Sequence, residues 1–198
     1  AHKSFQHCWC PHPRLAALFR SARGVVFLTE RQREVYDKNP FYACSRDAVL
    51  GCSLFSEAFF ELVDARPVDR SSRRGSAVVY SPNAIKGYAP ARRWVLRQGK
   101  ELCEIKNASP EQVLETFREC EELVYLPIGL EPAGRLPVEA RLAGCDVVVN
   151  QHVGVAGEPW WRGAPAGARA WLDAGPKPFW QVVEHLAKSE RAPPHDAP

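Results

Sequence analysis

Short apolar runs alternate with helix-like spacing of hydrophobic residues over most of this chain. In the second half, runs typical of strands occupy residues 76–80, 101–105, 122–127 and 146–150, and helical spacing fills 88–98, 110–120 and 135–143. Ser109 and Pro110 are typical of the start of the second of these helices. Strands joined in turn by helices predict a parallel sheet with right-handed crossovers, in which all four strands are buried on both faces.

The first part of the chain carries a shorter version of the same pattern. Helices are expected at residues 14–23 and 30–37, and strands at 24–29 and 48–52. The polar, Arg-rich stretch 65–76 has the composition of a linker. This composition predicts a domain boundary near residues 53–74.

The last part of the chain is rich in Gly, Pro and Trp beyond Gln151, and a final helix is expected at residues 178–188. The apolar face of this helix is formed by Phe179, Val182, Val183 and Leu186. Trp160 and Trp161 could stack on a sugar or a base. We favour the alternative that they pack in the core or between domains, because aromatic side chains are more often packed than ligand-binding.

The composition is that of an ordinary soluble globular protein, with 45% hydrophobic and 25% charged residues in a chain of 198. No stretch approaches the roughly 18 apolar residues that a membrane-spanning helix needs, so we expect no membrane span. The net charge of +3 is small, and the basic residues are spread along the chain. This distribution does not favour nucleic acid as a partner.

The cysteines and the amino end of the chain bear on its location. Seven cysteines, an odd and scattered set, do not resemble a secreted disulfide framework and favour a cytoplasmic location. The chain begins without an initiating Met or a signal-like segment, so we expect it to be part of a longer protein.

The early residues with zinc-ligand side chains are His2, His7, Cys8, Cys10 and His12. Their spacing is not that of a zinc finger, and we expect no metal site there.

A loop after the predicted strand 76–80 could bind an anion. In an open parallel sheet, ligands lie beyond the carboxyl ends of the strands, where the amino ends of helices present unpaired N–H groups. This loop contains Lys86, whose charge could contact a phosphate, and the flexible Gly87. The sequence therefore indicates an anion site at this edge of the sheet.

The loop after the predicted strand 122–127 carries two carboxylates with seven residues between them. Glu131 lies in the loop and Glu139 in the following helix. Gly134 allows close approach of the backbone to a ligand, and the N–H groups of Gly134 and Arg135 could meet phosphate oxygens. We expect one carboxylate to bind sugar hydroxyls and the other a ribose.

This second loop resembles the Glu-x7-Glu motif of family 4 and related retaining glycosyltransferases. The similarity runs from Glu131 to Glu139 and continues through residues 140–149. The Lys-Gly pair at residues 86–87 resembles the pair that follows the first strand of that family's carboxy-terminal domain. Residues 49–55 resemble the family's interdomain hinge.

The resemblance implies a GT-B architecture of two Rossmann-like domains. Residues 1–57 would be the end of the amino-terminal, acceptor-side domain with the hinge, 58–175 the nucleotide-sugar-binding domain, and 176–198 a closing helix and a disordered tail. The fold class expected is α/β, with a Rossmann-like parallel sheet that has helices on both faces. In GT-B enzymes the last helix crosses back to the amino-terminal domain.

The resemblance also implies an activity and a set of site residues. A sugar would pass from a UDP- or GDP-linked donor to an unknown acceptor with retention of anomeric configuration, without a metal or another cofactor. Glu131, at the catalytic position, would contact the donor sugar, Glu139 the ribose and Lys86 the diphosphate. Gly134 and Arg135 would complete the donor site.

Two alternatives remain open at this point. Ser81 stands where the family has an Arg, five residues before Lys86, so a second phosphate-binding cation would have to come from elsewhere, for example Arg135. A nucleotide-sugar-binding domain without turnover is therefore one alternative, with a complementing amino-terminal domain as a possible partner. A GT-B sugar-nucleotide epimerase is the other. Selectivity for the base would depend on loop contacts around residues 104–107.

Overall fold

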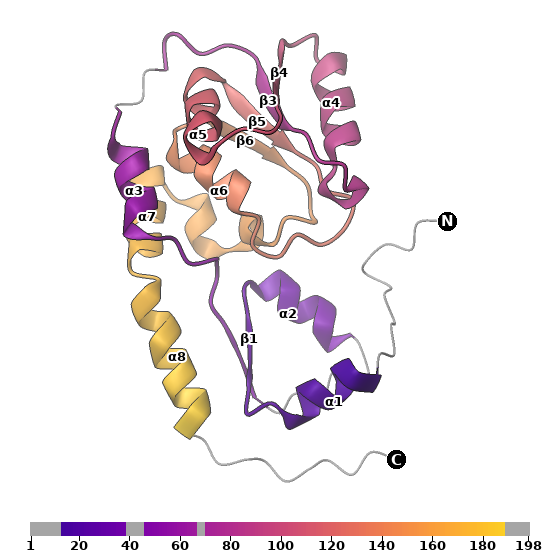
Figure 1. Cartoon of the computed structure of the whole chain (residues 1–198), viewed down its shortest axis with the longest axis vertical. Coiled ribbons are helices and arrows are strands. Elements are labelled where there is room, and N and C mark those ends of the chain that lie inside the picture. The colour runs from indigo at the N-terminus through magenta and orange to yellow at the C-terminus, as the bar shows by residue number, and fades with distance from the viewer. Residues whose placement is uncertain (1–12, 39–45, 67–69, 189–198) are drawn as a thin grey trace.

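The computed structural model describes residues 13–38, 46–66 and 70–188 (Figure 1). It contains two parallel sheets, one of two strands near the amino end and one of four strands from the middle of the chain. Helices flank both sheets. The expected α/β class with parallel strands is thus confirmed.

The four-stranded sheet consists of β3 (Ser76–Val79), β4 (Leu102–Ile105), β5 (Glu122–Tyr125) and β6 (Asp146–Val149). All pairings are parallel, and the order across the sheet is β4, β3, β5, β6. The chain therefore leaves β3 toward one edge and returns past it to reach β5. Open α/β sheets bind ligands where the winding reverses in this way, beyond the carboxyl ends of the two strands.

Helices cover both faces of the four-stranded sheet, as expected (Figure 1). The connecting helices are α4 (Tyr88–Arg97), α5 (Pro110–Glu119) and α6 (Arg135–Leu142). α4 lies on one face, where Val95 packs with Val78 and Val124. α5 and α6 lie on the other face, over a larger core that includes Phe117 and Leu123. Both faces of the central strands are therefore packed.

The prediction that all four strands are buried on both faces is wrong for the edge strands. Glu104 of β4 and Asp146 of β6 are exposed, whereas every residue of β5 is buried. An edge strand has a neighbour on one side only, so its side chains meet fewer packing partners. Polar residues are tolerated there.

α5 begins at the predicted N-cap. The Ser109 hydroxyl accepts the Gln112 N–H at 3.3 Å, and the Gln112 side chain accepts the Ser109 N–H at 2.8 Å. This reciprocal capping box satisfies two N–H groups that would otherwise lack partners. The local sequence thus fixes the start of the helix.

The amino-terminal unit consists of α1 (Pro13–Ser21), β1 (Val25–Phe27), α2 (Glu30–Asp37) and β2 (Asp47–Val49). These elements match the predicted ones, although both strands are shorter than expected. The two strands pair in parallel, with Val26 opposite Ala48. Thr29 caps the start of α2, and its fully buried hydroxyl accepts the Gln32 N–H at 3.3 Å. Polar groups at this helix start are therefore satisfied within the fold.

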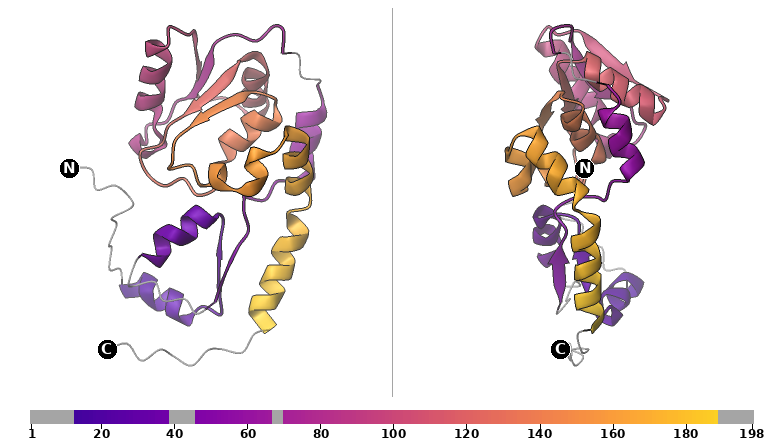
Figure 2. Two further views of the ribbon diagram at one scale, coloured as in Figure 1. Left: turned by 180° about the vertical axis from the view of Figure 1, so that it is seen from behind. Right: turned by 90° about the vertical axis from the view of Figure 1, so that its left-hand side faces the viewer.

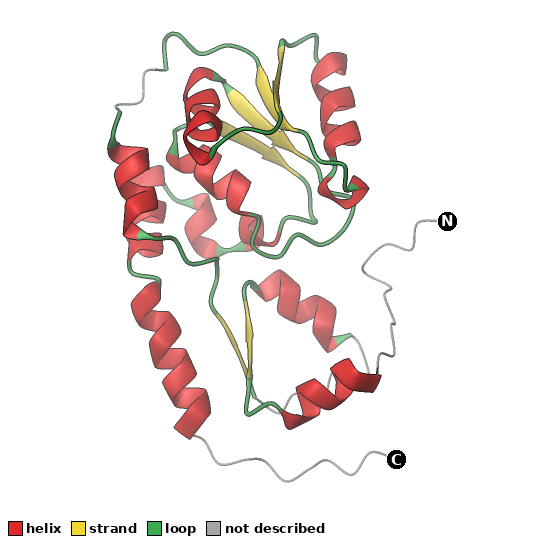
Figure 3. Ribbon diagram, in the orientation of Figure 1, coloured by secondary structure: helices red, strands yellow, loops and turns green. Residues whose placement is uncertain are grey.

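Two helices occupy stretches to which the hydrophobic pattern assigns no helix or strand (Figure 3). They are α3 (Glu57–Asp64) and α7 (Pro165–Asp173). α3 is capped by Ser56 and buries Phe60 and Val63. Arg169 of α7 joins the two helices through an ion pair with Asp64 at 2.7 Å and lies over the Phe60 ring. Mutual packing stabilises both helices.

The last helix, α8 (Pro176–Lys188), runs alongside the amino-terminal unit (Figure 2). Leu186 is 8% exposed, and its Cδ2 lies 2.8 Å from the position that a Cβ would take on Gly24. Arg23 donates a hydrogen bond to the Ala187 carbonyl at 3.0 Å. The expectation that the final helix packs against the first part of the chain is confirmed.

Trp160 packs in the core, against the segment that joins the two units. Two 3-10 turns, η3 (Gly154–Gly157) and η4 (Pro159–Arg162), follow β6. Trp160 stacks on Trp171 with ring centroids 5.2 Å apart, and its indole N–H donates to the Gly51 carbonyl at 3.0 Å. Gly51 belongs to the segment that leads from β2 to α3. Packing, which we favoured over ligand stacking, is thus observed for Trp160.

Among residues 13–38, 46–66 and 70–188, no helix is both long and apolar enough to cross a membrane. In the same ranges Cys52, Cys103, Cys120 and Cys145 are free thiols. Burial raises the pKa of Cys52 to about 12 and that of Cys145 to about 12, so these two thiols stay protonated. The early His and Cys residues and the expected tail lie outside the described residues.

Candidate functional site

The loops that follow β3 and β5 lie directly on each other at the carboxyl edge of the sheet. The first forms the 3-10 turn η2 (Ala84–Lys86) and ends at Gly87, which has a φ of 77°. A Cβ on Gly87 would lie 2.0 Å from the Leu126 carbonyl oxygen, so only glycine fits. The Ile128 N–H donates to the Ile85 carbonyl at 3.0 Å. This contact brings Lys86 next to the loop after β5.

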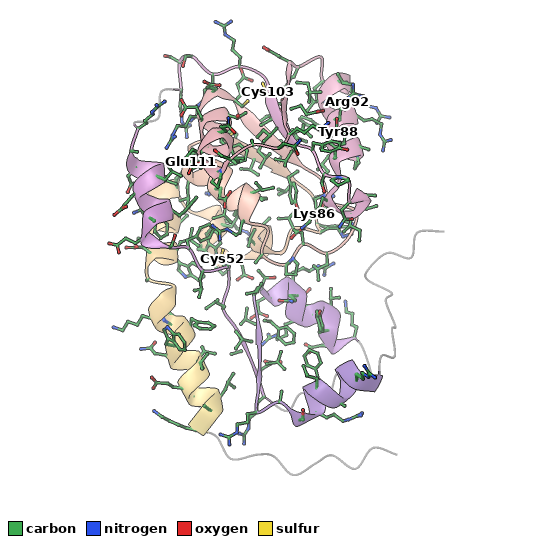
Figure 4. All side chains as sticks on the ribbon, viewed as in Figure 1. Cys52, Lys86, Tyr88, Arg92, Cys103 and Glu111 are labelled. Carbon is green, nitrogen blue, oxygen red and sulfur yellow. The ribbon has the colours of Figure 1, made fainter. Side chains whose placement is uncertain are left out.

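Lys86 and Glu131 form an ion pair across these two loops. Lys86 Nζ lies 2.5 Å from Glu131 Oε2, and the two side chains are 43% and 16% exposed. The same carboxylate oxygen accepts a hydrogen bond from the Tyr125 hydroxyl at 3.0 Å. We call Lys86, Tyr125 and Glu131 the Glu131 cluster. Figure 4 shows its lysine at the edge of the sheet that faces the amino-terminal unit.

Tyr125 is the last residue of β5 and is 5% exposed. Burial, and then the charge of Glu131, raise the pKa of Tyr125 far above its ordinary value. The phenol therefore remains protonated and donates to the carboxylate. It fixes one oxygen of Glu131 from inside the sheet.

The backbone of Glu131 is held by the loop that follows β6. Its N–H donates to the His152 carbonyl at 2.8 Å, and its carbonyl accepts from the Gly154 N–H at 2.9 Å. Asn150 braces this loop, because its amide donates to the Pro127 carbonyl at 2.8 Å and accepts the His152 N–H at 3.0 Å. Residues from three strand ends thus fix the position of Glu131, a degree of preorganisation expected of a binding site.

α6 begins beside the Glu131 cluster without a side-chain cap. Its N-cap residue, Gly134, is buried, and a Cβ there would lie 3.1 Å from Glu131 Cγ and 3.6 Å from Tyr125 Cε1. A larger residue would push against the carboxylate. The first N–H groups of an uncapped helix are suited to bind an anion.

Arg135 and Glu139 form a second pair on α6. Arg135 Nε lies 3.1 Å from Glu139 Oε1, and the side chains are 50% and 15% exposed. The guanidinium also lies over the rings of Phe55, at 4.6 Å, and Phe59, at 5.8 Å. No hydrogen bond or ion pair within the described part of the chain joins this pair to the Glu131 cluster. Each carboxylate of the Glu-x7-Glu spacing therefore has its own cation.

A group of aromatic and charged side chains lies on the β4 side of the same edge. Tyr80 and Tyr88 meet edge to face with centroids 5.0 Å apart, and Lys106 Nζ lies 4.6 Å from the centre of the Tyr80 ring. The Tyr88 hydroxyl donates to Glu104. This hydrogen bond raises the pKa of Tyr88. Tyr80 is 37% exposed and offers part of a ring face to solvent.

A cavity of about 270 Å³ lies between α2 and the loop after β6. It is lined by Glu30, Arg31 and Glu34 of α2 and by Asn150, Gln151, Val153, Gly154, Ala156, Gly157 and Glu158. The Glu158 carboxylate is 5% exposed and accepts the Glu30 N–H at 2.9 Å. Burial raises the pKa of Glu158 in spite of this bond. The two units of the chain therefore meet through a buried carboxylate at the start of α2.

Part of this arrangement is predictable from the sequence. Lys86, Glu131 and Gly134 were predicted as site residues, and they lie together. Tyr125 and Asn150 were missed, because the hydrophobic pattern assigns both to apolar strands. A hydroxyl or an amide near the carboxyl end of an apolar strand is the available signal, since that end lies at the binding edge of a parallel sheet.

Residues 13–38, 46–66 and 70–188 contain no group of three or more His, Cys, Asp or Glu side chains that could hold a metal ion. Comparison of the chain with protein-family models, with curated proteins and with solved structures found no match. The geometry at the carboxyl edge is therefore the basis on which a function can be proposed.

Proposed function

We propose that the carboxyl edge of the four-stranded sheet binds the diphosphate and sugar of a UDP- or GDP-sugar. The chain would be the donor-binding part of a retaining GT-B glycosyltransferase that transfers this sugar to an acceptor. The Lys86–Glu131 pair, 2.5 Å apart between β3 and β5, carries the proposal. It joins a cation suited to phosphate to a carboxylate suited to sugar hydroxyls, and these two groups are neighbours in a nucleotide sugar.

The proposed chemistry stabilises the leaving group. As the bond to the sugar breaks, negative charge grows on the diphosphate and positive charge on the sugar ring. Lys86 is nearly half exposed, so its ammonium can turn from Glu131 to the phosphate, helped by the first N–H groups of α6. Glu131, held by Tyr125, would then lie beside the sugar as a fixed negative charge. We assign it no covalent role.

Glu139 would bind the ribose hydroxyls. It lies about one helical turn beyond the N–H groups of α6 that face the diphosphate. Its present partner, Arg135, is half exposed and can release it at little cost. The acceptor would approach from α2, where the cavity of about 270 Å³ adjoins the loop that holds the Glu131 backbone. A complementing amino-terminal domain, as a partner, would supply the rest of the acceptor site.

A thermal-shift assay with UDP, GDP, UDP-glucose and GDP-mannose tests the proposal. A ligand present at 100 times its Kd stabilises the folded state by about 2.7 kcal/mol, or about 5 to 10 °C for a chain of this length. Glu139→Gln should remove most of the shift from every nucleotide. Glu131→Gln should remove only the additional shift that the sugar provides, and Glu111→Gln, on the exposed start of α5, is the matched control. Absence of a shift with all four ligands would exclude a nucleotide-sugar site.

A second candidate, nucleotide-sugar binding without turnover, is favoured by the state of Arg135. Ser81 replaces one phosphate-binding cation of the resembled family, and Arg135 is held by Glu139 and by the rings of Phe55 and Phe59. Chromatography that measures the release of nucleotide diphosphate from the donor distinguishes the transferase from the binding domain. Release with an acceptor or with water supports the transferase. Tight binding without release supports the binding domain, and a new sugar nucleotide without acceptor would indicate an epimerase.

A further inference from the structure

The outer face of α4 is strongly basic. Arg92, Arg93 and Arg97 are all exposed, and Leu96 among them is 50% exposed. Figure 4 shows Arg92 on the side of the helix that points away from the sheet. The opposite side of α4, with Ala91 and Val95, is buried against the strands. Three guanidinium groups thus share one short solvent face.

Arg93 and Arg97 have no hydrogen bond or ion pair within residues 13–38, 46–66 and 70–188. Several other arginines of the chain do pair with acids, as Arg66 does with Glu115 at 2.7 Å and Arg169 with Asp64 at 2.7 Å. Like charges four residues apart on a helix repel each other and destabilise it by a few tenths of a kcal/mol. Neither arginine is therefore held by an ion pair within the described residues, and both are available to a ligand.

The same two arginines border a groove. Its volume is about 480 Å³, and Pro90, Arg93, Trp94, Arg97 and Leu126 line it. The walls combine cations with apolar surface, since Trp94 and Leu126 are half buried against the core of this face. A volume in this range is typical of small-molecule sites. The groove therefore offers charge at its rim and an apolar wall.

We propose that this groove binds a small phosphate ester, with the phosphate between Arg93 and Arg97 and its ring or apolar part against Trp94 and Leu126. A guanidinium presents paired N–H donors that match two phosphate oxygens, and two of them one turn apart can hold one dianion. The concave, partly apolar wall favours a discrete ligand. Membrane-binding clusters usually contain four to eight basic residues, more than this face provides. The inference does not rest on the function proposed for the Glu131 cluster.

Phenyl phosphate is a suitable probe, because it carries both parts of the expected ligand. Binding should be measured by calorimetry at low salt in full-length chains that carry Lys86→Gln, so that the Glu131 cluster does not contribute. Phenyl phosphate should bind saturably and more tightly than inorganic phosphate. Adding R93Q and R97Q should weaken it by about tenfold or more, as expected when charge-assisted hydrogen bonds are lost.

Arg92→Gln is the matched control, since Arg92 is exposed on the same face but does not line the groove. It should change the affinity by less than about twofold, the size of a distant surface-charge effect. An equal loss with R92Q would overturn the groove as a site and leave a diffuse basic face. Sedimentation with phosphatidylserine vesicles completes the test. Binding to vesicles, with neither phosphate compound bound, would also overturn the proposal.

Discussion

Two glutamates at opposite ends of β5 are held by the same kinds of side chain. Glu122, at the start of the strand, accepts from Lys100 Nζ at 2.8 Å and from the Ser76 hydroxyl at 2.7 Å. Glu131, beyond the end of the strand, accepts from one lysine and one phenol at 2.5 and 3.0 Å. Each carboxylate thus has an ammonium and a hydroxyl as donors.

The surroundings of the two carboxylates differ. Ser76 and Glu122 are direct neighbours in the β3–β5 ladder and are 0% and 8% exposed, so their bond ties two strands together. Glu131 lies in a loop at the carboxyl edge, beside the uncapped start of α6. Residue types alone therefore do not distinguish a structural carboxylate from a binding one. Position relative to the strand ends does, and this difference can be tested.

Gly87→Ala should have the largest effect, because it breaks the carboxyl edge itself. A new Cβ would lie 2.0 Å from the Leu126 carbonyl oxygen and would force the two loops apart. The free energy of unfolding should fall by about 3 kcal/mol or more, as for other severe steric changes. Urea unfolding measures this loss, and the nucleotide-dependent thermal shift should disappear with it.

Gly99→Ala is the control for this variant. Gly99 also has a positive φ, 67°, but a Cβ there would meet nothing within 4 Å. It should therefore lose only about 1 kcal/mol, the cost of placing alanine in left-handed backbone. Equal losses for the two variants would contradict the close contact between the loops.

Glu122→Gln and Glu131→Gln should separate stability from binding. Glu122→Gln should lower the free energy of unfolding by about 1 to 2 kcal/mol, since it weakens the buried bond to Ser76, and leave ligand binding unchanged. Glu131→Gln should lower it by less than about 0.5 kcal/mol, because Lys86 can turn to water. Chemical unfolding and calorimetry with UDP-glucose measure the two quantities. If Glu131→Gln lowered the free energy of unfolding more than Glu122→Gln and left UDP-glucose binding unchanged, Glu131 would be the structural residue.

Tyr125→Phe should have a smaller, selective effect. Loss of one hydrogen bond to Glu131 should weaken UDP-glucose binding about fivefold, equivalent to about 1 kcal/mol. Binding of UDP alone should not change, because the phenol contacts only the carboxylate assigned to the sugar. Tyr80→Phe, at the same edge, is the control for general disturbance. An equal loss for both ligands would argue against a positioning role for Tyr125.

Glu158→Gln should have the smallest effect, visible as a change in pH dependence. Burial raises the pKa of Glu158 in the folded state. The favourable contribution of its neutral form is therefore present below the unfolded pKa and is lost as the pH rises through the folded pKa. In thermal unfolding, the melting temperature of the variant should be slightly higher than that of the parent chain at pH 7.5 and equal to it near pH 4. A lower melting temperature at pH 7.5 would mean that the ionised form stabilises the fold.

The regular part of the fold was predictable because each element carries its own local signal. Buried apolar runs specify β3 and β5, and the Ser109 cap specifies the start of α5. α7 lacks such a signal, since its sequence contains Gly167 and few large apolar residues. It forms because Ala168 and Leu172 are buried against the rest of the core. Tertiary packing of this kind is not encoded in local periodicity.

The candidate site was predictable in its parts but not in its pairing. Lys86 and Glu131 each follow a strand, which places both at the carboxyl edge. Their contact depends on β3 and β5 being neighbours, although β4 lies between them in sequence. Strand order follows from the packing of whole layers, so the ion pair and the partner role of Tyr125 became visible only in three dimensions.

The return of α8 to the amino-terminal unit means that the chain passes between the two units twice. The first passage follows β2 and the second precedes α8, and they touch, with Leu54 Cδ2 3.7 Å from the position of a Cβ on Gly175. Two units joined at two adjacent points rotate most easily about the line through those points, and rotation about other axes is restricted. Rotation about this line would widen the cavity beside α2 and would break the bond from the Glu30 N–H to the Glu158 carboxylate.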